Sequence, residues 1–146
     1  MRLILLLWCL FVCLLPAASA QRDDTVSVRG LLVAASAEPG PTDERLKPYE
    51  ATLRRILRFE SFRLLGEGRT AVRTPGEATV MLGQNHRLEL RSEPSTDRGL
   101  RMQVNWSQGG RSLMNTGLVL RRGVPAVLGG PPHGEGEVFA VIVVAQ

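Results

Sequence analysis

Residues 100–120 read LRMQVNWSQGGRSLMNTGLVL, and this stretch predicts a β-hairpin. Ahead of the two glycines, polar residues alternate with four apolar ones: Leu100, Met102, Val104 and Trp106. Alternation with a period of two places the two sets of side chains on opposite faces of a strand. Gly109 and Gly110 then accept the positive φ angles of a tight two-residue turn. We therefore expect one face of this hairpin to lie in a core.

The register of the hairpin decides which residues of its second strand share that face. A two-residue turn predicts three pairs: Trp106 with Leu113, Val104 with Asn115, and Leu100 with Val119. We expect Trp106 to be a core residue, because it is in phase with the other apolar residues of its strand.

Other strand patterns lie on both sides of the hairpin. Strands are expected at 25–36, 59–65, 78–82, 86–91 and 124–128. Gly66 to Gly68 is expected to end the strand before it, and 129–136 is expected to be a loop. The last apolar run, 138–144, does not alternate, which is typical of a strand buried on both faces.

One helix is expected at 43–58, because four apolar residues recur there at helical spacing: Leu46, Tyr49, Leu53 and Leu57. Pro48 removes an intrahelical hydrogen bond, so the helix either starts near Lys47 or is kinked at the proline. The expected fold class is α+β, a mainly antiparallel β-sheet of six to seven strands with one helix packed on one face.

The N-terminus has the pattern of a secretory signal peptide. Arg2 precedes an unbroken apolar run at 3–15, and Ala18-Ser19-Ala20 matches a cleavage site. The run is shorter than the roughly 20 helical residues that cross a membrane. We expect a signal peptide at 1–20, a single domain at 21–146, and export to the periplasm or the extracellular space. An uncleaved segment would instead tether the same domain to the membrane.

Composition narrows the classes of function. Cys9 and Cys13 both lie in the apolar run, so the mature domain would have no disulfide, thiol nucleophile or thiolate metal site. A cysteine-free exported domain favours a bacterial envelope. Removing Arg2 lowers the net charge from +4 to +3, a mild excess that does not point to nucleic acid. No cofactor is expected.

The sequence contains two histidines, His86 and His133, and no recognisable catalytic motif. The candidates for a Ser-His-Asp triad, besides the histidines, are Ser61, Ser107 or Ser112 with Asp43 or Asp97. None of these serines lies in the G-x-S-x-G sequence that is typical of a nucleophilic serine. Glu135 and Glu137 lie near His133, but their spacing matches no metal-binding pattern. We expect a protein that is not an enzyme, with His86 partly buried at the end of a strand.

Two surfaces are candidates for contact with a partner. Arg54 and Arg58 share a helical face with Lys47, and such a stripe can meet an acidic partner or be solvated. The second surface is the polar face of the first hairpin strand: Arg101, Gln103, Asn105 and Ser107.

The segment LVLRRGVPAVLGGP at 118–131 resembles the strand-turn-strand near the end of bacterial secretin domains, which form outer-membrane export pores. In those domains an apolar strand, a charged turn with glycine and a strand that ends in Gly-Gly recur. The mature region is too short for a secretin's periplasmic modules and pore domain. The resemblance implies a small secretin-related accessory protein that pairs its strands with a partner or with copies of itself. It assigns no functional residue.

These observations predict a non-enzymatic exported envelope protein that acts in protein-protein interaction or assembly, related to type II secretion through the secretin resemblance. Its partner would be another protein or a second copy, bound through sheet faces and edges. The alternative is a small-ligand-binding periplasmic domain, with the loop at 129–136 and His133 over a pocket. A third hypothesis, a hydrolase, requires His86 or His133 within hydrogen-bond reach of a serine and a carboxylate.

Overall fold

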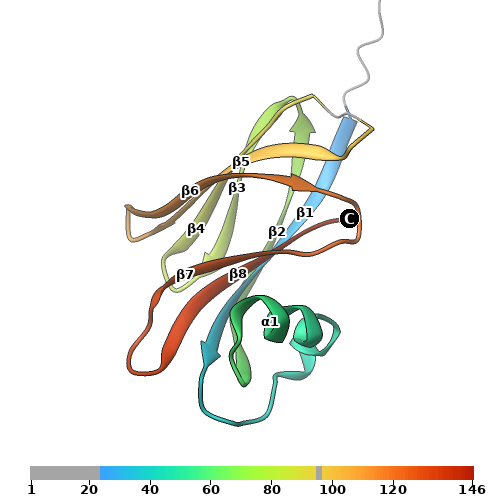
Figure 1. The fold of residues 1–146 in the computed structure, drawn as a ribbon. Coiled ribbons are helices and arrows are strands. Elements are labelled where there is room, and N and C mark those ends of the chain that lie inside the picture. Colours follow the sequence, from blue (N-terminus) through green and yellow to red (C-terminus); the bar gives the residue numbers. More distant parts are fainter. Residues whose placement is uncertain (1–23, 95–96) are drawn as a thin grey trace, which may run out of the picture.

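A computed structural model describes residues 24–94 and 97–146, which form eight strands and a short helical segment (Figure 1). The strands are β1 (Asp24–Ser36), β2 (Ser61–Thr74), β3 (Gly76–Gly83), β4 (His86–Ser92), β5 (Leu100–Gln108), β6 (Arg111–Leu120), β7 (Ala126–Pro132) and β8 (Glu137–Ala145). The expected signal peptide at 1–20 lies outside the described residues. Among the residues that are described, no helix is long and apolar enough to span a membrane.

The strands form two antiparallel sheets that pack face to face. Sheet A has the order β2-β1-β8-β7, and sheet B has the order β3-β4-β5-β6. The helical segment covers the outer face of sheet A, so the layers are helix, sheet A and sheet B (Figure 1). The predicted class, mainly antiparallel β with one helix, is confirmed. The eight strands, against about six to seven expected, divide into two sheets, because the chain passes from sheet A to sheet B between Thr74 and Gly76.

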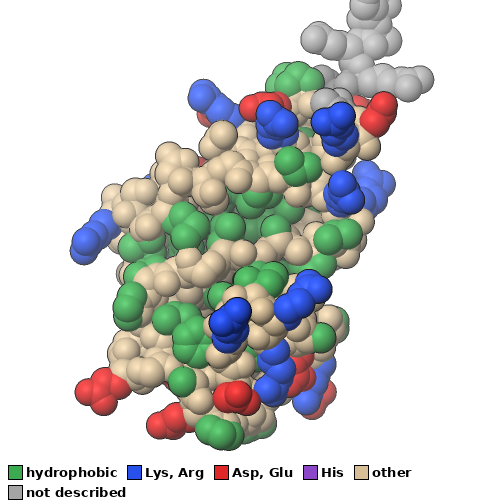
Figure 2. Space-filling model, in the orientation of Figure 1, with side chains coloured by type: hydrophobic (Ala, Val, Ile, Leu, Met, Phe, Trp, Pro, Cys, Tyr) green, Lys and Arg blue, Asp and Glu red, His purple; other side chains and the backbone are tan. Residues whose placement is uncertain are grey.

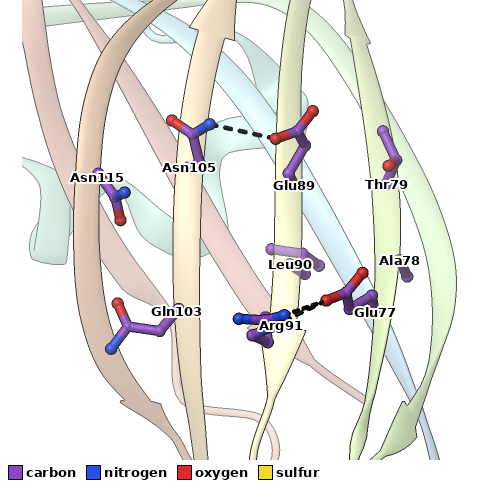
Figure 3. A pocket seen from close by; sticks show the side chains of 9 residues that line it. All are labelled: Glu77, Ala78, Thr79, Glu89, Leu90, Arg91, Gln103, Asn105 and Asn115. Carbon is purple, nitrogen blue, oxygen red and sulfur yellow. Dashed lines mark hydrogen bonds and ion pairs between the residues drawn. The ribbon is translucent and has the colours of Figure 1, made fainter.

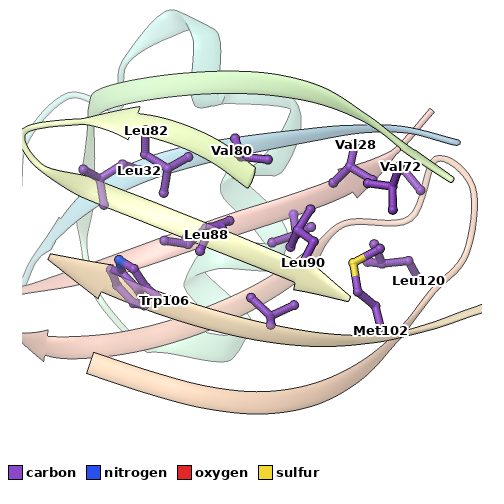
Figure 4. Packing of buried hydrophobic residues seen from close by; sticks show 14 of the residues in the cluster. Val28, Leu32, Val72, Val80, Leu82, Leu88, Leu90, Met102, Trp106 and Leu120 are labelled. Atoms are coloured by element: carbon purple, nitrogen blue, oxygen red, sulfur yellow. The ribbon is translucent and has the colours of Figure 1, made fainter. Parts of the chain in front are cut away.

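The alternating residues of both sheets build the main core between them (Figure 4). Trp106 is fully buried there, as predicted. The other large side chains that are fully buried in this core are those of Leu32, Leu82, Leu88, Leu90, Met102 and Leu120. Burial of a large aromatic side chain is worth several times the net contribution of one hydrogen bond, so this layer dominates the stability of the fold.

Strand β8 is buried on both faces, as its unbroken apolar run predicts. Val141 and Val143 lie in the main core, whereas Ile142 and Val144 lie in a second core under the helix with Leu53. A strand between two cores has no polar face to offer to water, which explains why its sequence does not alternate.

Pro48 divides the helical segment into two parts. A 3₁₀ stretch, Glu44–Tyr49, contains the proline, and α1 (Glu50–Leu57) follows it. Because proline lacks an N–H and its ring clashes with the preceding turn, regular α-helical hydrogen bonding begins only after it. The helical segment therefore begins next to Asp43, as expected, but becomes α-helical only from Glu50.

The predicted hairpin forms, but its register is shifted by one residue. The observed pairs are Trp106 with Met114, Val104 with Thr116, and Leu100 with Leu120. A β-bulge between Trp106 and Ser107 leaves Leu113 as an extra residue in β6. A shift of one residue moves every side chain to the other face. Met114, Thr116 and Leu118 consequently face sheet A, and Asn115 faces outward.

Gly66 and Gly68 do not end a strand, contrary to the sequence-based expectation, but lie within β2. A Cβ atom at Gly66 would overlap the carbonyl oxygen of Leu82, and one at Gly68 would overlap that of Met81. Glycine within a strand often marks a close approach of another backbone. These two glycines allow β3 to lie directly against β2.

The first half of the predicted loop at 129–136 is strand. Strand β7 continues to Pro132, which leaves only 133–136 as the turn before β8. Gly130 lies against the indole of Trp106, where a Cβ atom would overlap the ring. His133 stacks on Phe139 with 4.1 Å between ring centroids. This segment therefore covers the end of the core.

Candidate functional site

The two sheets leave their edge strands β6 and β7 beside each other on one side of the sandwich (Figure 1). Within the described residues β6 is hydrogen-bonded only to β5, and β7 only to β8. The outward N–H and C=O groups of an edge strand have no partner in its own sheet. This side of the molecule, which we call the open side, is where a further strand can be added.

Apolar side chains reach the surface between these two strands. Leu113, Met114 and Leu118 of β6, with Ala126 and Leu128 of β7, are only partly buried where they pack on the main core. Figure 2 shows hydrophobic side chains in the band between β6 and β7. The core is therefore incompletely covered along the open side.

Strand β7 is protected against pairing with another chain, and β6 is not. Prolines, charges and bulges are the usual means by which edge strands avoid such pairing. Strand β7 ends in Pro131 and Pro132, and its register with β8 is irregular there. Strand β6 has no charged residue from Ser112 to Leu120, and its pairing with β5 is regular beyond the bulge. We call residues 114–120 the open edge.

A hollow of about 490 Å³ lies at the end of the open edge. Its lining combines two arginines with apolar residues: Arg98, Val119, Arg121, Val124, Pro125 and Ala126. Val119 and Val124 are 49% and 55% exposed. Within the part of the chain that the structure describes, no ion pair involves Arg98 or Arg121. We call this feature the arginine hollow.

The outward face of sheet B carries a larger hollow, of about 540 Å³ (Figure 3). Arg91 Nε donates to Glu77 Oε1 at 2.8 Å, and Asn105 Nδ2 donates to Glu89 Oε2 at 3.2 Å. The amide of Gln103 lies over Gly117 of β6. This hollow is lined by polar groups, several of which already bind one another.

The predicted polar face of the first hairpin strand is correct in part. Arg101 and Gln103 are exposed and Asn105 is half-buried. Ser107 is buried, because the bulge beside it interrupts the alternation. Arg101 lies 3.8 Å from Glu93 and lines a second small hollow that shares Arg98 with the arginine hollow.

The predicted stripe of Arg54, Arg58 and Lys47 is wrong as a single helical face. Lys47 lies in the 3₁₀ stretch, and Arg58 lies past the end of α1 with a φ of 57°. Arg54 donates to Glu50 at 2.9 Å and to Glu60 at 3.3 Å, and the Arg54 hydrogen bond lowers the pKa of Glu50. Contact of these arginines with a partner stays a prediction.

His86 is fully buried beside Trp106, further inside than expected. Trp106 Nε1 donates to His86 Nδ1 at 3.0 Å, which places the proton of the neutral ring on Nε2. Nε2 itself has no partner among the described residues. Burial lowers the pKa of His86, and the charge of His133 lowers it further. No serine or carboxylate bonds this ring in the described part of the chain.

The described residues contain no cluster of three or more histidine, cysteine, aspartate or glutamate side chains that could hold a metal ion. The open edge and the arginine hollow were not identified from the sequence, although the uncharged run from 112 to 120 and the arginines that follow it are visible there.

Comparison of the chain with protein-family models, curated proteins and solved structures finds no match in any of the three.

Proposed function

We propose that this protein is a non-enzymatic protein of the bacterial envelope that binds an extended segment of a partner along the open edge, as an added strand of sheet B. Export, which the pattern at 1–20 predicts, is part of the proposal. The observation that carries it is an uncharged and regularly paired edge strand beside half-buried apolar side chains.

An added strand would satisfy the outward backbone groups of β6 and cover the apolar side chains along the open side. Its hydrogen bonds supply affinity, and its alternate side chains supply specificity. Removal of apolar surface from water also favours binding, and it must exceed the cost of ordering the added segment. The closed side offers no such position, because β3 lies against β2 there.

The proposal also agrees with the resemblance of 118–131 to secretin strands, since this segment contains the end of β6 and all of β7 except Pro132. A component of a type II secretion pore is therefore the first partner to test.

A photoreactive amino acid at position 116 tests the proposal in cells of the native host. Thr116 is half-buried at the open side, on the face of β6 that is turned toward sheet A, whereas Thr79 is exposed on the outer face of β3 and provides a threonine control. We expect a discrete cross-linked partner from position 116 and none from position 79. Equal cross-linking from both positions, or none from position 116, would contradict the proposal.

The lysine variants of the same residues give a second measurement. Thr116→Lys places a charge on the open edge and should abolish the complex, because a buried charge without a partner opposes strand addition. Thr79→Lys should leave it intact. In the complex, hydrogen exchange of the β6 amides should slow selectively, since outward N–H groups acquire acceptors.

A second candidate function, binding of a small polar molecule, has the outer-face hollow in its favour. Gln103 and Asn115 line this hollow and make no side-chain hydrogen bond in the described part of the chain, so both amides are available to a ligand. Native mass spectrometry of protein purified from its host tests this candidate. A bound metabolite that is lost in Gln103→Ala and kept in Thr116→Lys would favour it over strand addition.

A further inference from the structure

We propose that the segment accepted by the open edge is an extended peptide whose uncharged, alternating stretch is preceded by acidic residues that bind Arg98 and Arg121 in the arginine hollow. The inference rests on the proposed strand addition and names the chemistry of the partner. It follows from where charges lie around β6.

Arginines flank the uncharged open edge at both ends. Arg111 precedes it as the first residue of β6, and Arg121 and Arg122 follow it. None of these three forms an ion pair with another described residue. A strand laid along β6 would therefore meet apolar and neutral groups over its length and positive charge at its ends.

The same charges disfavour a second copy of this chain as the occupant. Two β6 strands paired antiparallel about Thr116 would place Arg111 of one copy close to Arg121 of the other, at both ends of the pair. Like charges directly across a strand pair are destabilising. A partner with acidic residues converts this repulsion into attraction.

The arginine hollow has the composition expected for recognition of a carboxylate on an otherwise apolar peptide. Guanidinium groups bind carboxylates through paired hydrogen bonds, with a geometry that lysine cannot reproduce. Val119, Val124 and Pro125 supply apolar surface beside them. Arg101 is less available than Arg98, because Glu93 lies 3.8 Å from it.

The direction of β6 fixes which end of the peptide is acidic. Strand β6 runs from Arg111 to Leu120, so its last residues lie next to the hollow. Antiparallel pairing is the more stable arrangement and the one used throughout both sheets. An antiparallel peptide brings its N-terminal end to the hollow, and its acidic residues therefore precede the alternating stretch.

Binding of three fluorescently labelled synthetic peptides to the full-length chain, measured by fluorescence anisotropy, tests the inference. Each has the same alternating threonine-valine stretch. The first carries two aspartates before it, the second two aspartates after it, and the third two lysines before it. We expect the first to bind about tenfold more tightly than the second, and the third to bind most weakly, with differences that shrink as salt is added.

Matched variants assign the effect to the hollow. Arg98→Gln with Arg121→Gln should abolish the preference for the first peptide. Arg55→Gln with Arg69→Gln removes the same charge from exposed positions on α1 and β2, and should leave the preference unchanged. Circular dichroism of both double variants confirms that each is folded.

The outcomes separate this inference from the proposed function. Equal binding of all three peptides that is lost in Thr116→Lys would overturn acidic recognition and leave strand addition standing. A preference that persists in the Arg98→Gln, Arg121→Gln variant, or no binding of any peptide, would also overturn it. Cross-linking from position 116 judges strand addition independently of these peptides.

Discussion

The two long sides of the sandwich differ in how closely their edge strands approach. On the closed side β2 and β3 lie backbone against backbone, because Gly66 and Gly68 have no side chains to hold them apart. On the open side β6 and β7 keep their side chains between them, and the apolar residues there stay half-buried. The difference shows that two edge strands can close one side of a sandwich only where small residues let their backbones approach. Where larger side chains stand between the edge strands, that side remains accessible.

The largest effect is expected from Trp106→Ala, at the end of the open side where Gly130 of β7 covers the indole. Removing a fully buried tryptophan costs roughly 3–5 kcal/mol, because both its burial and the space it fills are lost. Urea unfolding measures this change. Trp106→Phe keeps most of the burial but leaves His86 Nδ1 without its donor, and should cost less. A melting curve unchanged by Trp106→Ala would remove this residue from the core.

Gly66→Ala tests the closed side directly. Its new methyl group would overlap the carbonyl oxygen of Leu82, so the two backbones must separate, at a cost of about 3 kcal/mol. The matched control is Gly129→Ala in β7, whose new methyl group would lie 3.4 Å from Leu57 in ordinary contact. It should change the free energy of unfolding by less than about 1 kcal/mol. Equal effects of the two substitutions would contradict the contrast between the sides.

The buried His86 makes stability depend on pH. Burial lowers the pKa of its ring below the ordinary 6.5, so the unfolded chain binds the proton more strongly than the folded protein. Stability should be fully present above about pH 6.5 and should fall as the pH drops below it, by at most about 1.4 kcal/mol per pH unit. Urea midpoints between neutral and mildly acidic pH measure the slope. His133→Gln should keep most of it, whereas His86→Phe should flatten it; the same slope in all three proteins would place its origin elsewhere.

The smallest effect on folding is expected from the lysine variants that matter most for binding. Thr116→Lys and Thr79→Lys should each change the free energy of unfolding by less than about 1 kcal/mol, because Thr79 is exposed and Thr116 is only half-buried. Equal thermal melts of the two variants, with binding lost only in the first, would separate recognition at the open side from stability. A large loss of stability in Thr116→Lys alone would mean that β6 and β7 already close this side.

Several features followed directly from patterns along the chain. The alternation from Leu100 to Trp106 predicted the buried face of β5, and the unbroken run at 138–144 predicted a strand that is buried on both faces. The turn at Gly109 and Gly110 was also correct. The register after that turn was not, because a bulge depends on how the second strand packs and leaves no mark in the alternation itself.

The candidate site could be predicted only in part. The alternation correctly predicted the outward face for Arg101, Gln103 and Asn105. It failed for Ser107, which is buried because the bulge beside it interrupts the alternation. The open edge could not be recognised, since a strand becomes an edge only when the order of all strands is known. Arg98 and Arg121 come together for the same reason, from two turns at one end of the sandwich.

By itself, the sequence determined the class of the fold, the buried face of β5 and the burial of β8 on both faces, because the period of hydrophobicity is a local property of each segment. The tertiary structure decided the division into two sheets, the role of Gly66 and Gly68, and the presence of one closed and one open side. These features depend on contacts between residues that are far apart in the chain. How closely two strands can approach is set by the space around their backbones, which the hydrophobic pattern of either strand does not reveal.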